Sequence, residues 1–262
     1  MGFEQLFEPT RLLTFFFIMI RLGGIFFTAP IFSSAVVTPQ VRMLLTIMVA
    51  LVLAPFVEPL TVTDPNVLWL ILTAFKEVLI GVIIGAMTSL LFSALQLGGY
   101  IIDYQMGFSM VSVMDPTSNA TVSFSGQVYN ILATLIYLAL NGHHIFLRAV
   151  SSSFEYLPLA NFAFQPEGVM FVISTFSKMF IVAMQIIAPA FIALMITNAV
   201  MGVMARLVPQ INLMIVGFPL KIGIGAIMII AAMQLFYVVF EKIMFEYFRQ
   251  IKKFFEISIM QF

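Results

Sequence analysis

Long stretches without a charged residue constrain this chain most. They cover Leu22–Val41, Val78–Ile102, Met179–Ala205 and Ile222–Phe240. Each is close to the roughly 20 residues that an α-helix needs to cross the hydrocarbon of a bilayer. None alternates between polar and apolar residues, as the strands of a membrane barrel do. The sequence therefore predicts an all-α integral membrane protein.

Composition points the same way. The 262 residues are 62% hydrophobic and 9% charged, with a mean hydropathy of +1.10, whereas charged residues make up about a quarter of a soluble domain. The chain has no cysteine, which excludes a disulfide framework, a thiolate nucleophile and a cysteine-ligated metal. Its formal net charge is zero, which gives no indication of nucleic-acid binding. Membrane lipid is the expected surrounding because of the apolar composition.

The apolar segments are expected to be helices arranged as hairpins. Their connections are short, so we expect one integral membrane domain over residues 1–262 without a hydrophilic domain. The second segment is flanked by Pro39, Pro55 and Pro59, which suits a hairpin arm better than a full span. The expected segments are 12–32, 41–57, 67–103, 128–147, 168–205 and 211–240.

A polar loop between two long apolar segments is the first candidate for function. Gln105–Ser125 reads QMGFSMVSVMDPTSNATVSFS and is too rich in polar and turn-forming residues for a membrane helix. Irregular backbone at membrane depth is tolerated only inside protein or along a wet cavity. The loop is therefore predicted to line or block a pore.

Methionines recur every fourth residue at the start of this loop. Met106, Met110 and Met114, with Phe108 among them, would form one soft stripe on a helix. Methionine side chains can pack against surfaces of irregular shape, although methionine stripes usually only fill space in a hydrophobic core. The helix-breaking Asp115-Pro116 pair that follows argues against filler.

Small residues form a ridge along the third segment. Gly81, Gly85, Ser89 and Ser93 are four residues apart, which lets another helix backbone approach closely. The ridge is predicted to be a packing face. The sequence leaves open whether it packs within the chain or against another subunit.

Two cations lie inside apolar segments. A charge at the bilayer centre costs at least about 2.5 kcal/mol unless it snorkels or faces a cavity. Arg21 is deep in the first segment and is a candidate functional charge. Lys178 lies in the fifth segment, where a small register shift would bring it to a helix end, and both interpretations stay open.

A pair of histidines invites a catalytic interpretation. His143 and His144 stand in the sequence NGHH, and histidine exchanges protons near neutral pH. No HExxH zinc motif or GxSxG nucleophile elbow accompanies them. We therefore expect a helix-end pair that hydrogen-bonds to loop backbone and predict no enzyme activity, catalytic residue, cofactor or metal.

The connection at 206–221, RLVPQINLMIVGFPLK, has a polar tip flanked by basic residues. A plain helical hairpin explains it, and the tip could also dock a partner at a membrane face. Short connections rich in lysine and arginine usually lie in the cytoplasm. Both this connection and the residues after Phe240 are basic, but a single membrane-spanning helix between them would place them on opposite sides. The orientation therefore stays open. The candidate docking residues are Arg206, Pro209, Gln210, Asn212 and Lys221.

Several stretches together resemble the FliR family of flagellar export-gate proteins, whose counterpart in virulence secretion is the SctT family. The resemblance covers nearly the whole chain. It rests on the order and spacing of short pieces, none of them specific alone. They are RLGGIFFTAPIF with Pro39 and Arg42, LGGYIIDYQMGFSMVSVMDP, LALNGHH and RLVPQINLMIVGFPLK.

The resemblance implies a subunit of the type III export gate in the flagellar basal body of the bacterial inner membrane. It would form a hetero-oligomer with FliP and FliQ, beside FlhB and FlhA, as the closed entry channel for unfolded flagellar proteins. It also implies a plug loop at about 105–125, with Met and Phe side chains sealing the lumen. The implied plug residues are Met106, Gly107, Phe108, Ser109, Met110, Val113, Met114, Asp115 and Pro116.

The resemblance further implies two parts. Residues 1–178 would be FliP-like and include the plug. Residues 179–262 would be a FliQ-like helical hairpin, with its 206–221 tip toward the cytoplasm and FlhB, and a basic C-terminal tail.

Two other functions remain open. One is the equivalent SctT-like subunit of a virulence secretion system. The other is a secondary transporter that binds an anionic solute through Arg21 and Lys178.

Overall fold

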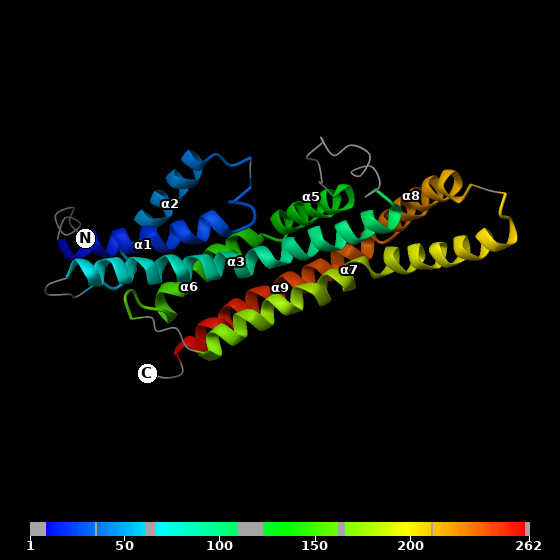
Figure 1. Cartoon of the computed structure of the whole chain (residues 1–262). Helices are drawn as coiled ribbons and strands as arrows, with labels where there is room; N and C mark the ends of the chain where they lie inside the picture. The colour runs from blue at the N-terminus through cyan, green and yellow to red at the C-terminus, as the bar shows by residue number, and fades with distance from the viewer. Residues whose placement is uncertain are drawn as a thin grey trace. The chain divides into compact units, whose positions relative to one another are not determined.

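The protein is described by a computed structural model over residues 9–34, 36–60, 66–108, 123–161, 166–210 and 212–259. Within these ranges every regular element is a helix, which confirms the all-α prediction. Figure 1 shows the helices in chain order. They are α1 (Pro9–Thr28), α2 (Pro39–Leu53), α3 (Val67–Met106), α5 (Phe124–Ala139), α6 (Gly142–Tyr156), α7 (Pro166–Leu207), α8 (Leu213–Ala231) and α9 (Met233–Ile259).

Three helices are long and apolar enough to cross a membrane, namely α1, α3 and α7. The number rises to five if the bent pairs α5–α6 and α8–α9 each count as one span. Helix α2 is too short for this group, as its flanking prolines suggested. The chain therefore has the helices of an integral membrane protein.

The apolar segment 128–147 is not one helix, and that prediction is wrong. Helix α5 closes with a hydrogen bond from the Leu140 N–H to the carbonyl of Ile136 at 2.9 Å. Asn141 then takes a left-handed conformation with φ of 54°, which asparagine tolerates better than most residues. Helix α6 starts at the next residue, so the sequence NGHH begins a helix instead of ending one.

The last apolar segment also divides, because α8 ends at Ala231 and α9 begins at Met233. Helix α9 continues well past the predicted end of this segment, through the residues assigned to a basic tail. Buried residues recur along it every three or four positions, as in an amphipathic helix. They are Phe236, Phe240, Met244, Tyr247, Ile251 and Phe254.

The chain forms two compact units that interleave in sequence. Unit 1 comprises the described parts of 1–90, 141–176 and 245–262, and unit 2 comprises those of 91–140 and 177–244. Helices α3, α7 and α9 contribute to both. The predicted division into FliP-like and FliQ-like parts concerns likeness to other proteins and stays a prediction.

Unit 1 is built around one apolar cluster shared by α1, α2, α3, α6 and α9 and by the connections after α2 and α6. Lipid is itself apolar, so close packing and small residues hold such helices together instead of a hydrophobic driving force. The cluster's buried members from α1, α3, α6 and α9 include Phe17, Leu22, Phe26, Ile80, Ile84, Phe146, Val150, Ile251 and Phe254.

Unit 2 is held by aromatic contacts among α3, α5 and α9. The Phe92 ring lies 6.0 Å from the Tyr137 ring and 6.3 Å from the Phe240 ring, measured between centroids. Tyr129 lies 5.2 Å from Phe236. These are favourable spacings for tilted and edge-to-face aromatic pairs. They hold α3 and α5 in place, and the polar loop connects these two helices.

Candidate functional site

Helix α3 ends in a glycine turn at the start of the polar loop. Gly107 has a φ of +94°, and its N–H donates to the carbonyl of Tyr104 at 3.1 Å. The N–H of Phe108 donates to the carbonyl of Asp103 at 3.0 Å. This pair of bonds is a Schellman motif, which satisfies carbonyls at a helix end. The chain therefore leaves α3 in a fixed direction.

A buried carboxylate joins the two ends of the loop. Asp103, near the end of α3, accepts from the Ser123 hydroxyl at 2.7 Å and from the Ser125 hydroxyl at 2.5 Å. It also accepts from the Ser125 N–H at 3.2 Å, while the Ser123 hydroxyl oxygen caps α5 by accepting from the Gly126 N–H at 2.8 Å. An anion is favourable at a helix N-terminus. Asp103 thus fixes the start of α5 against α3.

The helix backbones also meet closely at this point. A Cβ atom at Gly99 on α3 would collide with the backbone of Gly126 on α5. Only a residue without a side chain permits this approach. Together with Asp103, the contact makes a rigid base for the loop, and we call these three residues with Ser123 and Ser125 the loop base.

Aromatic and methionine side chains extend from the loop base to α8. The Phe108 ring lies 6.2 Å from Phe124 and 6.4 Å from Phe218. A Cβ at Gly225 of α8 would collide with the Met106 side chain, so this glycine makes room for the methionine. The start of the predicted plug therefore packs on α8.

A polar contact connects the end of α3 to α7. The Asn198 side-chain amide donates to Gln105 Oε1 at 2.9 Å, and Gln105 Nε2 lies 3.8 Å from Met195 Sδ. Hydrogen bonds between side chains are a common way to join membrane helices. The loop base is thus braced by α5, α7 and α8 within unit 2.

The structure describes only the first part of the predicted plug. Met106, Gly107 and Phe108 occupy the positions given above. The other candidates lie outside the described residues. They are Ser109, Met110, Val113, Met114, Asp115 and Pro116.

Two members of the small-residue ridge lie where α3 crosses α1. A Cβ at Gly81 would collide with the carbonyl oxygen of Arg21, and one at Gly85 would collide with the Thr28 hydroxyl. Ser89 is half-buried and Ser93 is exposed. The described contacts of Gly81 and Gly85 are therefore within unit 1.

Arg21 forms an ion pair that the sequence analysis did not anticipate. Its Nε donates to Glu77 Oε2 at 2.5 Å, and both side chains are fully buried. Its Nη1 donates to the carbonyls of Ser153 at 3.1 Å and Leu157 at 2.9 Å. The guanidinium carbon lies 4.6 Å from the centre of the Phe154 ring. The charge of Arg21 is thus compensated within unit 1.

The other candidate residues are spread over the chain. Lys178 is exposed on α7. His143 is half-buried and His144 exposed at the start of α6, with ring centroids 4.2 Å apart. Helix α7 ends at Leu207 and α8 begins at Leu213, so the predicted 206–221 connection includes the first turns of α8. Arg206, Pro209, Gln210 and Asn212 are exposed, whereas Lys221 lies within α8, away from the predicted tip, and is half-buried.

Glu77 and Asp103 are the functional candidates that sequence reasoning missed. They flank the charge-free run Val78–Ile102, and both are buried. An acid at the edge of such a run needs a partner, because a lone buried charge is costly. Applied to this sequence, the rule would have looked for a cation such as Arg21 to pair with Glu77, and for hydroxyl donors such as Ser123 and Ser125 to bond Asp103.

Replacing Asp103 by alanine is expected to loosen the loop base. The variant leaves the buried Ser125 hydroxyl and N–H without their acceptor, at a cost of about 1–3 kcal/mol. Amide hydrogen exchange of residues 123–127 in detergent should accelerate by at least about tenfold. Ser93→Ala, at an exposed position on the same helix, is the control and should leave this exchange unchanged. Unaltered protection in Asp103→Ala would show that Asp103 does not hold α5.

Comparison with known proteins places this chain in a family. Residues 12–247 match the family described as bacterial export proteins, family 1. The flagellar biosynthetic protein FliR of Bacillus subtilis is 34% identical over 231 residues, which cover 86% of this chain and 88% of that protein. FliR of Escherichia coli is 27% identical over 84% of each chain, and FliR of Aquifex aeolicus is 27% identical over 97% of this chain and 95% of its own. The chain therefore belongs to the bacterial export proteins of family 1, the family of the FliR flagellar biosynthetic proteins.

Proposed function

We propose that this protein is a core subunit of the flagellar export gate. It would assemble with FliP and FliQ, beside FlhB and FlhA, into the entry channel for unfolded flagellar proteins in the bacterial inner membrane. The family match over residues 12–247 and the flagellar names of its relatives support this role. They favour a flagellar system over the SctT-like alternative.

The loop after Phe108 is proposed to be the plug of that channel. The observation that carries this proposal is the loop base. Asp103 bonds both Ser123 and Ser125, and Phe108 lies beside Phe124, so the loop leaves and returns at one braced point. The helices on either side of the loop are held together at that point.

The side chains of the loop suit a seal that opens and closes. Methionine and phenylalanine make dispersion contacts of about 0.1–0.2 kcal/mol per atom pair. Contacts of this kind exclude ions when many form together, and a passing chain can separate them without breaking a strong bond. Met106 and Phe108 pack on α8 through Gly225 and Phe218, a helix that belongs to the part we propose to be FliQ-like.

The test is to replace residues 109–122 with a Gly-Ser linker of about four residues, which spans roughly 10–12 Å. This length is enough because Phe108 and Phe124 lie side by side. The variant keeps the loop base, so it should assemble normally and make cells expressing the gate permeable to ions. Membrane potential and small-solute leak are the measurements. A tight membrane with normal assembly and export would contradict the plug.

The transporter alternative finds little support in the position of its candidate charges. Arg21 is buried and paired with Glu77, and Lys178 is exposed on α7. An anion site needs a cation that is not already neutralised. Solute uptake by the isolated protein in liposomes would revive this alternative.

A further inference from the structure

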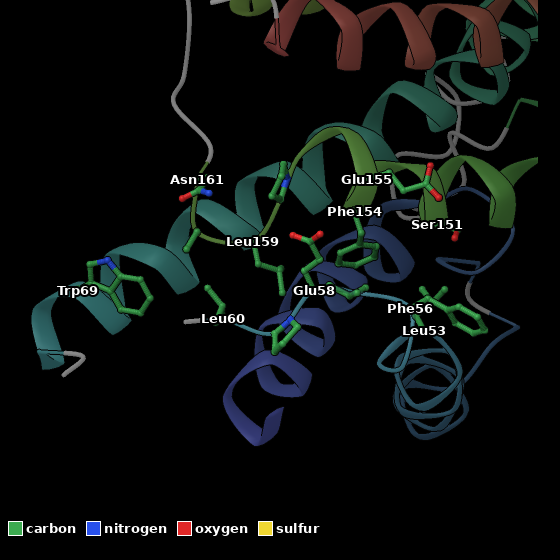
Figure 2. A pocket seen from close by; sticks show the side chains of 14 residues that line it. Leu53, Phe56, Glu58, Leu60, Trp69, Ser151, Phe154, Glu155, Leu159 and Asn161 are labelled. Atoms are coloured by element: carbon green, nitrogen blue, oxygen red, sulfur yellow. The ribbon is translucent and has the colours of Figure 1, made fainter. Parts of the chain in front are cut away.

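Unit 1 contains a pocket of about 660 Å³ that none of the roles above uses. It lies between the connection after α2, the first turns of α3 and the end of α6 with the turn that follows. Figure 2 shows its lining side chains, with Trp69 and Phe56 toward opposite ends and Glu58 between them. This volume is within the about 300–1,000 Å³ range of pockets that bury most of a ligand.

One wall of the pocket is fixed by the buried ion pair. Arg21 donates to the carbonyl of Leu157 at 2.9 Å, and Glu77 Oε1 accepts from the Ala160 N–H at 3.1 Å. Ala160 has a φ of 67°, an unfavourable conformation that persists only where the surroundings impose it. The ion pair therefore holds the turn from Leu157 to Asn161 in one shape.

The opposite wall is fixed by α1. The Leu60 N–H donates to the hydroxyl of Thr14 at 2.9 Å, and both residues are buried. Leu60 and Leu159, one from each wall, are buried apolar lining residues. The pocket is thus formed before any ligand arrives, which lowers the entropy lost on binding.

The charge of the pocket is acidic and uncompensated. Glu58 and Glu155 both line it, and both residues are exposed. No lysine, arginine or histidine in the described residues forms an ion pair with either of them. No basic residue lines the pocket either. Its surface therefore complements a ligand with a cationic group and an apolar body.

We propose that this pocket binds a segment of a partner subunit in which a lysine or arginine stands among aliphatic residues. The inference rests on the proposed function in that the partner belongs to the same gate. A long basic side chain places its methylenes against apolar walls and its charge beside carboxylates. Trp69 also lines the pocket, and an indole ring attracts a cation placed over it. Lipid fits less well, because two carboxylates repel the phosphate of a headgroup.

Photo-crosslinking of the purified assembly tests this proposal. Phe56 is 82% exposed and lines the pocket, so Phe56→p-benzoylphenylalanine places a conservative probe there. We expect the probe to crosslink a partner peptide that contains Lys or Arg among aliphatic residues. Phe75→p-benzoylphenylalanine, at a position 61% exposed on α3 and outside the pocket, is the matched control and should not label that peptide.

Reversing the charge of the two glutamates is the second test of the proposal. In Glu58→Lys/Glu155→Lys the crosslink should fall by about tenfold or more, since like charges at an interface are repulsive. Glu256→Lys, an exposed glutamate of α9 in the same unit, should keep it. Reversing the crosslinked basic residue of the partner to glutamate should restore the crosslink in the double variant.

The outcomes separate the inference from the proposed function. Crosslinks only to lipid, to a second copy of this chain or to an uncharged peptide would overturn the pocket assignment, as would an undiminished crosslink in the charge-reversed variant. In each case an intact multi-subunit assembly would leave the gate role standing. Purification of the chain without any partner subunit would instead contradict the gate role itself.

Discussion

Glu77→Ala is expected to destabilise unit 1 by about 3–5 kcal/mol, which is the usual effect of removing one member of a buried ion pair. The variant leaves the fully buried Arg21 guanidinium without its carboxylate. It also removes the acceptor for the Ala160 N–H. Unfolding in detergent, followed by circular dichroism across a denaturant series, measures the loss.

A double variant distinguishes the effect of losing the ion pair from the effect of losing side-chain volume. Arg21→Met/Glu77→Leu fills a similar volume with apolar groups, and such replacements are often neutral or stabilising. We expect it to recover most of the stability that Glu77→Ala loses. It should not recover the turn at Leu157 and Ala160, whose hydrogen bonds come from the charged groups. The pocket crosslink from Phe56 should therefore stay weak in a stable protein.

These results discriminate between two purposes of the ion pair. If the double variant keeps both stability and the crosslink, the pair is only a packing element. If Glu77→Ala is as stable as the wild type, the buried pair is not formed in the protein. Stability without the crosslink is the expected pattern, because apolar replacement of a buried pair is often neutral for stability, whereas the hydrogen bonds to Leu157 and Ala160 come only from the charged groups.

Much of the helical architecture follows from the pattern of charges. The charge-free runs Val78–Ile102 and Met179–Ala205 lie within α3 and α7, because an uninterrupted apolar run is stable in lipid only as a helix. The run Leu22–Val41 instead extends past the end of α1 at Thr28 into α2, and the run Ile222–Phe240 is divided between α8 and α9. The predicted segment 67–103 differs from α3 by three residues at its C-terminal end. The glycine turn at Gly107 explains the true boundary, and it was visible in the sequence as the first glycine after that run.

The helix breaks were harder to predict. Asn141-Gly142 is a helix-stop signal, but it lies inside an apolar segment whose hydropathy predicts one continuous helix. At Ala232 the neighbouring residues are alanine, methionine and glutamine, all of which favour helix. That break therefore arises from packing, which a linear pattern does not contain.

The sequence predicted the loop of the candidate site but not the contacts that hold it. The polar loop was found from composition alone, because a polar stretch between membrane helices needs a reason. Its anchoring by Asp103 was not found, because the two serines that bond it are 20 and 22 residues away in sequence. Arg21 and Glu77, which form the ion pair, are 56 residues apart in sequence. Contacts at such separations depend on which helices become neighbours.

Gly81→Ala is expected to destabilise unit 1 by about 3 kcal/mol or more, at or beyond the upper end of the usual cost of overpacking. The added methyl group would overlap the carbonyl oxygen of Arg21 and lie 3.1 Å from Gly24 Cα and from Ile25 N. These are backbone atoms, which cannot rotate away as a side chain can. Helices α1 and α3 must therefore separate.

The control is a glycine of α1 that has no such neighbour. A Cβ at Gly23 meets nothing within 4 Å, so Gly23→Ala should stabilise the helix by up to about 1 kcal/mol. Thermal unfolding of the two variants in the same detergent gives the comparison. Equal effects of the two substitutions would mean that α1 and α3 do not cross at Gly81.

The crossing at Gly81 also brings the ion pair together. Glu77 stands one helical turn before Gly81, and the carbonyl that the methyl group would strike belongs to Arg21 itself. Separating the helices by even part of an ångström lengthens the contact between Arg21 and Glu77. Gly81→Ala and Glu77→Ala should therefore be non-additive, with a coupling of about 0.5–3 kcal/mol as found for residues that share partners. Strict additivity would mean that the close helix crossing and the buried charge pair stabilise unit 1 independently.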